Sequence, residues 1–294
     1  MLVLRLLVLL PLIVASTLLH ALPLLAVALF KAVLPLRAVR AACNRVLAGL
    51  GESWIGFNGW LWDRLTRTRL TVHDDTRPQA DGHYLVLANH GSWVDILVLQ
   101  KVFNRRIPFL RFFLKRQLFW VPVLGLAWWA LDFPFMGRYS PKQIARNPAL
   151  AGRDIAATRR ACEKFRDLPV AIMNFVEGTR FTPAKHAAQG SPFANLLKPK
   201  SGGVAFVLQA MGEGLHAIMD VTIAYPAGTP SLLDLLGDRI PEVRVRVRQR
   251  VIPAELRTGD YQNDRAFRVR FQQWMNDVWK EKDADLSALL ADRA

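Results

Sequence analysis

The sequence predicts an α/β fold, in which helices cover the faces of a sheet, behind a long apolar segment at the amino terminus. Buried-strand patterns alternate with helical patterns along the chain, which is typical of such a sheet. The strand patterns lie at 84–88, 169–175 and 216–225, and the helical patterns at 92–102, 148–165 and 203–211. With 294 residues, the chain is long enough for one large domain with an appendage.

Two further elements complete the predicted domain near the carboxyl terminus. Residues 243–248 alternate valine with arginine, the period of a strand with one exposed face. Residues 264–282 show an amphipathic pattern that predicts a closing helix, and we expect residues 283–294 to be frayed. On this interpretation the three arginines form an electrostatic face for an anionic partner. They are Arg244, Arg246 and Arg248.

Residues 6–30 predict a membrane anchor, because they contain no charged side chain. A helix over this run is roughly 37 Å long, more than the ~30 Å hydrocarbon core of a bilayer. A secretory signal has a shorter apolar region of about 7–15 residues, so we expect a retained anchoring segment over residues 1–62. Pro11 and Pro23 tend to kink a helix, and Pro23 is a candidate bend. A spanning helix and a re-entrant hairpin both fit.

The positive charge of the chain indicates that its partners are anionic. The formal net charge is +15, and 52% of the residues are hydrophobic. Basic surfaces bind nucleic acid or phospholipid headgroups. Tryptophans in or beside apolar segments that also carry arginine or lysine favour the membrane interface, and the sequence has no zinc-ligand spacing or RNP-type pattern. These tryptophans are Trp54, Trp60, Trp62, Trp120, Trp128 and Trp129.

A second apolar region covers residues 107–136 and is interrupted by Arg111, Lys115 and Arg116. Apolar side chains surround these cations and leave them on a limited face. That pattern favours a helix lying in the membrane interface. The alternative is an ordinary helix buried in the protein core.

The residues best suited to chemistry follow the first buried strand. Strand-to-helix junctions of α/β sheets are where active sites tend to lie. His90 precedes a predicted helix start, and Asp95 lies in that helix's first turns. A carboxylate bonded to one imidazole nitrogen fixes the tautomer and leaves the other nitrogen free as a base. Ser92 is a candidate nucleophile, but it lacks the Gly-x-Ser-x-Gly turn, so we expect it to cap the helix.

The chain resembles the glycerolipid acyltransferase family, which includes the 1-acylglycerol-3-phosphate acyltransferases, over roughly residues 80–226. The resemblance rests on five blocks in order: Asn89-His90 with Asp95, Phe133–Arg138, Phe175–Arg180, Leu197–Gly203 and Val221–Pro226. Val176 stands where the family usually has proline. The block at 197–203 looks like the bacterial and lysocardiolipin-type branch. The resemblance implies a mixed sheet flanked by helices, here over residues 63–294.

The resemblance also implies how acyl transfer would proceed. His90 would take the proton from the acceptor hydroxyl as that hydroxyl attacks an acyl thioester, and Asp95 would orient the imidazole. No covalent acyl-enzyme is needed, because the acceptor alcohol is the nucleophile. The expected reaction moves a fatty acyl group to 1-acylglycerol-3-phosphate and gives phosphatidic acid. The alternatives are another lysophospholipid acceptor and, in a different class, a non-catalytic basic membrane-binding protein.

Several residues are candidates for binding the acceptor. Arg138 and Arg180 carry guanidinium forks that match phosphate geometry. Gly178 permits close backbone approach, while Glu177 and Thr179 bind acceptor hydroxyls or order their loop. Lys198 and Lys200 precede a predicted helix, where phosphate can bind through side chains and backbone amides. A basic loop that contacts headgroups nonspecifically is the alternative for these two lysines.

The remaining expectations concern donors, metals and location. We expect acyl-CoA or acyl-carrier protein as the donor substrate and no cofactor, and the six histidines form no metal-ligand pattern. Cys43 and Cys162 are expected to be ordinary reduced residues. More cations follow the apolar anchor than precede it. The positive-inside rule therefore places the catalytic domain on the cytoplasmic face, and we expect a bacterial inner membrane.

Overall fold

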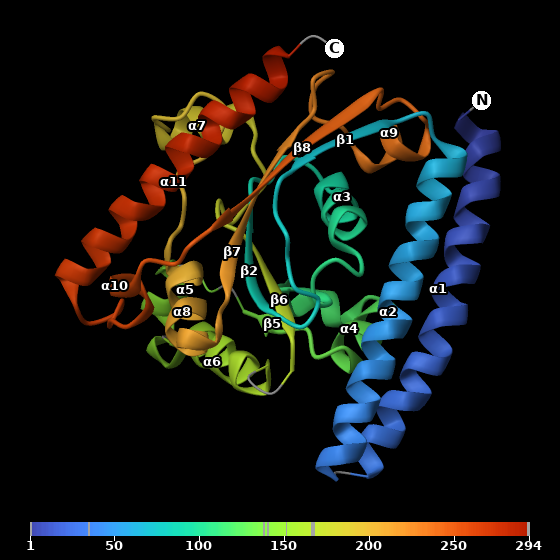
Figure 1. The fold of residues 1–294 in the computed structure, drawn as a ribbon, viewed down its shortest axis with the longest axis horizontal. Coiled ribbons are helices and arrows are strands. Elements are labelled where there is room, and N and C mark those ends of the chain that lie inside the picture. Colours follow the sequence, from blue (N-terminus) through green and yellow to red (C-terminus); the bar gives the residue numbers. More distant parts are fainter. Residues whose placement is uncertain are drawn as a thin grey trace.

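A computed structural model describes residues 2–34, 36–137, 139, 141–150, 152–165 and 168–292. Its centre is a six-stranded mixed sheet in the order β1-β8-β7-β2-β6-β3 (Figure 1). The strands are β1 Arg69–Asp74, β2 His83–Ala88, β3 Leu110–Phe112, β6 Val170–Phe175, β7 Ala217–Ala224 and β8 Glu242–Arg250. A separate pair joins β4 Leu114–Lys115 to β5 Phe135–Met136. The predicted α/β class and mixed sheet are confirmed.

Helices cover both faces of the sheet. They are α1 Leu2–Val33, α2 Arg37–Leu65, α3 Val94–Phe103, α4 Leu124–Ala130, α5 Pro141–Arg146, α6 Arg153–Phe165, α7 Pro183–Gln189, α8 Gly202–Met211, α9 Leu232–Leu236, α10 Ala254–Arg257 and α11 Arg265–Ala291. Short 3-10 helices lie at η1 Arg116–Trp120, η2 Pro148–Leu150 and η3 Gly212–Gly214. One core packs α3 with parts of α1, α2 and α4 against the sheet. The other packs α6, α8, α10 and α11 on the opposite face.

The strand directions determine where the loops meet. β2 runs parallel to both β6 and β7, whereas β8 is antiparallel to β7. The carboxyl ends of β2, β6 and β7 therefore share one edge of the sheet. The loops that begin at Asn89, Val176 and Tyr225 leave from this edge. Asn89 joins two of these strands, because its side chain donates to Ile223 O and accepts from Ile223 N, each at 2.9 Å.

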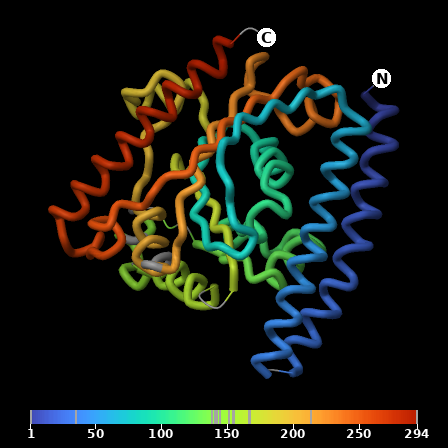
Figure 2. Tube along the Cα trace, viewed as in Figure 1, coloured from blue at the N-terminus to red at the C-terminus, as the bar shows by residue number. Residues whose placement is uncertain are grey.

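The amino-terminal segment is a pair of helices lying along one side of the domain (Figures 1 and 2). α1 is long and apolar enough to cross a membrane. It continues through both Pro11 and Pro23, so the candidate bend at Pro23 is wrong, and the chain turns back between α1 and α2 instead. Ion pairs tie both ends of α1 to the domain. They are Arg5–Asp238 at 3.4 Å and Lys31–Asp132 at 2.7 Å.

Residues 107–136 do not form the single helix that their apolar pattern favours. They divide among β3, β4, η1, α4 and β5. Pro122 interrupts the segment at its middle, where its missing N–H and rigid ring disfavour a helix interior. Arg111 is also not an exposed cation, since only 6% of its surface is accessible. Its guanidinium lies 5.1 Å from the Phe165 ring centre and donates to Leu131 O.

The carboxyl-terminal part is more ordered than the sequence suggests. α11 extends to Ala291, so residues 283–291 are helical and not frayed. Their packing explains the difference, because Leu286 and Leu289 are buried. Asp285 pairs with the arginines at 246 and 248 at 2.8 and 2.6 Å. Arg244 is itself buried and donates to Leu289 O. The arginines of β8 therefore help to hold α11, while the side chains of Arg246 and Arg248 stay 32% and 46% exposed, so the electrostatic face stays a prediction for these two.

The start of α6 and the state of the two cysteines also bear on the sequence predictions. The helix expected over 148–165 begins only at Arg153, because Gly152 has a φ of +74° that ends the preceding turn. Cys43 and Cys162 are both buried and reduced, as expected of ordinary apolar residues.

Candidate active site

His90 and Asp95 meet at the carboxyl edge of β2. The Nδ1 atom of His90 lies 2.9 Å from Asp95 Oδ2. The His90 side chain is 14% exposed and that of Asp95 is 1% exposed. The predicted pair is therefore brought together, with the imidazole reachable and the carboxylate buried. A proton on Nδ1 donates to Asp95, so Nε2 carries the free lone pair.

Asp95 accepts from more groups than its histidine. The backbone N–H groups of Gly91 and Ser92 donate to its Oδ2 at 2.8 and 2.9 Å. The hydroxyl of Tyr225 donates to its Oδ1 at 2.6 Å. Every one of these partners is a donor, an arrangement that fits an ionised carboxylate. Burial and the charge of Asp95 raise the pKa of Tyr225 well above its ordinary value, so Tyr225 stays a donor.

Sequence reasoning missed Tyr225. It lies 130 residues from Asp95 and reaches the site only because β7 is adjacent to β2. A signal was present, since Tyr225 ends the apolar block at 221–226 that carries part of the family resemblance. Like His90, it lies in a loop that leaves the carboxyl end of a buried strand.

Ser92 has a structural role. Its Oγ donates to Pro230 O at 2.6 Å and accepts from Val94 N at 3.0 Å. The acceptor bond satisfies a backbone donor in the first turn of α3, as the expected cap would. A hydroxyl committed to a backbone carbonyl is poorly placed as a nucleophile.

The His90 loop is joined directly to the loop after β6. Phe181 N donates to His90 O at 2.7 Å. The Phe175 ring stacks on the imidazole with centroids 3.8 Å apart and planes 14° apart. Phe175 is the last residue of β6, so the strand end supports one face of the ring. The two predicted motif loops thus form one site.

Glu177 lies inside this site and not on its surface. Its exposure is 0%, and neither carboxylate oxygen has a partner with normal hydrogen-bond geometry within the described part of the chain, although the backbone amides of His90 and Leu197 lie near enough to lower its pKa. Burial raises its pKa from 4.5 to about 8, against opposing effects of the His90 backbone amide and of Lys282. Its burial fits the expected role of ordering the loop, and a role in binding the acceptor hydroxyl stays a prediction.

Lys282 is a second buried charge that the sequence did not indicate. It lies on α11 with 0% exposure and pairs with Asp220 of β7. It also donates to Val221 O at 2.5 Å. Arg250 completes the group with a 2.7 Å contact to Asp220. This network anchors α11 under the strands whose ends carry the site.

Gly178 lies at the surface of the loop with a φ of +69°. An added Cβ there would lie 3.1 Å from Lys200 Cδ. The Lys200 backbone donates to Val176 O at 2.8 Å, which holds the two segments together. The structure therefore brings exposed Lys200 to the Gly178 turn. Exposed Lys198 is fixed only through its backbone, which donates to Gln189 Oε1 at 3.1 Å.

Thr179 and Arg180 complete the loop, together with a lysine that the sequence did not single out. Lys185 Nζ donates to Thr179 Oγ1 at 2.8 Å and to Arg180 O at 2.9 Å. The Arg180 guanidinium lies 4.8 Å from the Trp93 ring centre, a cation–π contact. Cationic groups therefore cluster beside the dyad. Arg138, the other predicted guanidinium, lies outside the described residues.

An apolar cavity of about 420 Å³ lies on the same side of the sheet as α3. Its wall combines side chains from the helix pair, the dyad loop and two short helices. They include Leu10 and Ile13 of α1, Trp54 of α2, Trp93, Leu97 of α3, Trp128 of α4 and Leu235 of α9. The Trp93 ring also makes the cation–π contact with Arg180, so Trp93 contacts both the cavity and the cationic cluster.

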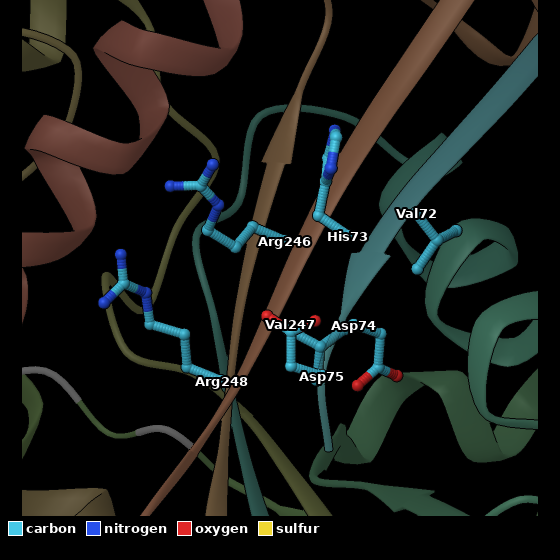
Figure 3. A pocket seen from close by; sticks show the side chains of 7 residues that line it. All are labelled: Val72, His73, Asp74, Asp75, Arg246, Val247 and Arg248. Atoms are coloured by element: carbon cyan, nitrogen blue, oxygen red, sulfur yellow. The ribbon is translucent and has the colours of Figure 1, made fainter.

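A second, larger cavity is unrelated to the dyad. Its volume is about 660 Å³, and it lies on the outer strands β1 and β8. Figure 3 shows the side chains of Arg246 and Arg248 extending toward α11, where both pair with Asp285. None of its lining residues comes from the loops that carry His90 or Glu177. In the described ranges, no three His, Cys, Asp or Glu side chains are grouped to hold a metal ion.

Known proteins resemble the chain in the region that contains this site. Residues 69–226, more than half of the chain, match the family described as Acyltransferase. The chain is 29% identical over 211 residues to a probable 1-acyl-sn-glycerol-3-phosphate acyltransferase 5 of Arabidopsis thaliana. That alignment covers 67% of this chain and 53% of the relative.

A mammalian relative gives a similar match. The chain is 27% identical over 215 residues to 1-acyl-sn-glycerol-3-phosphate acyltransferase gamma of Mus musculus, which covers 69% of this chain and 52% of that protein. The chain thus spans about half the length of these curated relatives.

One solved structure shares the fold. It is the 1-acyl-sn-glycerophosphate (LPA) acyltransferase PlsC from Thermotoga maritima, with a TM-score of 0.50 and 17% identity. The match covers 96% of this chain and 97% of that chain. At this identity the likeness supports the architecture and carries no residue roles.

Proposed function

Because the chain belongs to the glycerolipid acyltransferase family, we propose that it transfers a fatty acyl group to the free hydroxyl of 1-acylglycerol-3-phosphate. The product is phosphatidic acid. The observation that carries the proposal is the His90–Asp95 contact of 2.9 Å at the edge where the family match lies. The curated relatives described above are named for the same reaction.

The proposed chemistry starts at His90 Nε2. This nitrogen accepts the proton of the acceptor hydroxyl while the hydroxyl oxygen bonds to the thioester carbonyl carbon. Asp95 stabilises the imidazolium that forms. Collapse of the tetrahedral adduct breaks the carbon–sulfur bond, and the imidazolium returns its proton to the departing thiolate. The products are an ester and a free thiol. The same histidine accepts the proton and then gives it back, so no other acid or base is needed.

The acceptor phosphate is proposed to bind the cations beside the dyad. Arg180 is exposed and rests on Trp93, and Lys200 lies against the Gly178 turn. Lys185 orders the same loop through Thr179. A phosphate held by several charge-assisted bonds fixes the distance from headgroup to hydroxyl. Lys198 and Arg138 are proposed as additional phosphate contacts on the family resemblance.

The apolar cavity suits a fatty acyl chain. Its walls are mainly leucine, isoleucine and tryptophan, and burial of methylene groups there stabilises binding by about 0.8 kcal/mol each. Trp93 lies in its wall and in the dyad loop, so a chain in the cavity ends near the reacting carbonyl. The donor is proposed to be acyl-CoA or acyl-carrier protein, with no cofactor.

Membrane association is supported by α1 and its exposed side chains. Leu19, Leu22, Leu29 and Val33 are each about two-thirds exposed or more. Residues 1–62 are proposed to anchor the domain at the cytoplasmic face of a bacterial inner membrane. The ion pairs at both ends of α1 hold the helix beside the domain, which keeps the dyad close to lipid.

A panel assay tests the proposed function. Purified protein is given lysophospholipids with different headgroups, with acyl-CoA or acyl-carrier protein as donor, and ester formation is measured. We expect transfer to 1-acylglycerol-3-phosphate and its loss in His90→Ala. Exposed His73 on β1 provides a matched control, and His73→Ala retains transfer. Full activity in His90→Ala contradicts the mechanism.

The same assay separates the two alternatives. Preference for a larger headgroup identifies another acceptor with the same chemistry. If the protein binds vesicles but forms no ester with any combination of donor and acceptor, the second alternative holds, and the chain is a non-catalytic membrane-binding protein.

A further inference from the structure

Three large apolar side chains are exposed between η1 and α4, at what we term the η1–α4 corner, residues 115–129. The exposed fractions are 81% for Trp120, 55% for Trp129 and 46% for Leu126. Single exposed apolar residues are common on soluble proteins. Three within ten positions, two of them tryptophans, form a patch of the kind that marks an interaction surface.

The corner has a fixed shape. Val123 has a φ of +63°, a region that β-branched residues rarely adopt. Gly125 packs so tightly that an added Cβ would lie 1.9 Å from Phe119 O. The Phe119 ring contacts Trp120 and Phe135 edge-on, with centroid distances of 5.3 and 5.7 Å. The exposed side chains are therefore presented by a strained, well-packed turn.

The corner continues the exposed face of α1. α4 packs against α1 in the helix layer that Figure 1 shows beside the sheet. Lys31 pairs at 2.7 Å with Asp132, which lies just after α4. Leu29 and Phe30, the neighbours of Lys31, are 68% and 53% exposed. The exposed apolar residues near the end of α1 and those of the corner therefore lie on elements that contact each other.

Charge identifies the partner. Lys115 and Arg116 are exposed at the start of the corner. Tryptophan beside arginine and lysine suits the boundary between headgroups and acyl chains, where the ring is half-solvated and the cations contact phosphates. We propose that the η1–α4 corner is a second lipid-binding element. Trp120, Leu126 and Trp129 insert at the headgroup boundary, while Lys115 and Arg116 bind anionic headgroups. This rests on the proposed membrane association of α1.

Lipid quenching of single fluorescent labels tests the proposal in the full chain. Cys43 and Cys162 are buried, so a thiol label goes to an introduced cysteine. In the 3-10 helix η1, side chains three apart lie on one face, so Gln117→Cys places the label beside an intact Trp120. Leu29→Cys labels α1. Val251→Cys, at an 85% exposed position beyond β8, is the control.

Each labelled protein is reconstituted in vesicles rich in phosphatidylglycerol that carry a quencher in their acyl chains. We expect strong loss of fluorescence at 117 and 29 and little at 251. Quenching at 29 but not at 117 overturns the proposal and leaves α1 as the anchor. Quenching at neither position overturns the membrane association itself. Protection at 117 together with energy transfer between labelled copies shows self-association, which also overturns it.

A loss-of-binding measurement adds an independent readout. Trp120→Ser removes a large apolar contact, so partitioning into the same vesicles weakens roughly tenfold. Val251→Ser changes an equally exposed position and leaves partitioning unaltered. Equal partitioning of the two variants contradicts a lipid contact at Trp120.

Discussion

Asp95 and Glu177 are buried carboxylates at the same edge of the sheet, yet they are held in opposite ways. Asp95 has 1% exposure and accepts bonds from two backbone amides, a tyrosine and its histidine. Glu177 has 0% exposure, and its two oxygens lack a hydrogen-bond partner in the described ranges. Burial is nearly equal for the two groups, so the difference lies in the donors around them.

The comparison separates two uses of a buried acid. Donors around a carboxylate favour its charged form, whereas burial alone favours its neutral form. Asp95 can therefore steady a positive imidazolium, while Glu177 is mostly protonated at neutral pH, since its pKa is raised to about 8. We therefore propose that Asp95 takes part in the chemistry and that Glu177 orders its loop. The following variants test that division, from the largest expected effect to the smallest.

Asp95→Asn should remove the charge that stabilises the His90 imidazolium. An amide placed among four donors has an NH₂ group facing at least one of them, and it cannot steady the imidazolium. We expect kcat to fall about 10³-fold. Because the dyad acts as a unit, Asp95→Asn in a His90→Ala background should add little further loss. Independent, multiplying losses would show that Asp95 acts apart from His90.

Glu177→Gln should change how the stability of the folded protein depends on pH. The folded protein holds a proton at Glu177 up to about pH 8, whereas the unfolded chain releases it near 4.5. This contribution to stability is therefore fully present below about 4.5 and is lost as the pH rises through about 8. Glutamine is neutral throughout, so the variant gains on the wild type by a few kcal/mol between these values.

The measurement is urea unfolding of the full chain at several pH values in the same detergent. Stability curves of wild type and Glu177→Gln that stay parallel from acid to pH 8.5 would show that Glu177 carries no raised pKa. Retained transfer activity at pH 7 is also expected, because glutamine resembles the protonated acid in shape and charge.

Tyr225→Phe should weaken Asp95 without removing it. The change leaves Asp95 Oδ1 buried without its 2.6 Å donor. A hydrogen bond to a charged group contributes about 1.5–3 kcal/mol, so kcat should fall about tenfold. Tyr84→Phe is the matched control, because its hydroxyl accepts from Gln79 N at 2.7 Å at the opposite end of β2. A similar loss of kcat in both variants would argue against a specific role for Tyr225.

Gly178→Ala should have the smallest effect, on acceptor binding. A φ of +69° costs a side chain about 1 kcal/mol, and the new Cβ displaces Lys200. We expect a raised KM for the acceptor with kcat little changed. Gly190 offers a control with φ +51° and open space around an added Cβ. If Gly190→Ala raises the acceptor KM equally, Lys200 displacement is not the cause.

Local patterns predicted the parts of the molecule that depend on neighbouring residues. Strand β2 matches its predicted range to within a residue, because its last five residues are buried on both faces and form a continuous hydrophobic run. His90 and Asp95 were predicted as a pair because they lie only five positions apart in the sequence. The prediction of one helix over residues 107–136 was wrong because the apolar side chains there belong to five short elements. The spacing of hydrophobic residues in the sequence does not reveal where those elements begin and end.

Long-range contacts explain the rest. Tyr225 and Lys282 reach their partners only through the order of strands and the docking of α11. The arginines of β8 have the alternation of an exposed face, yet Arg244 is buried, and the other two pair with Asp285 of α11. Glu177 was placed in the right loop, but its burial depends on packing from β6, β2 and α11 together, which the local sequence does not contain.

The fastening of α1 at both ends has a consequence for how substrate is found. A domain on a flexible tether would tumble above the bilayer and meet lipids in random orientations. Arg5 and Lys31 leave this domain no hinge at its anchor. On the proposed membrane association, its search for lipid is confined to two dimensions, and the domain keeps one orientation relative to α1 throughout.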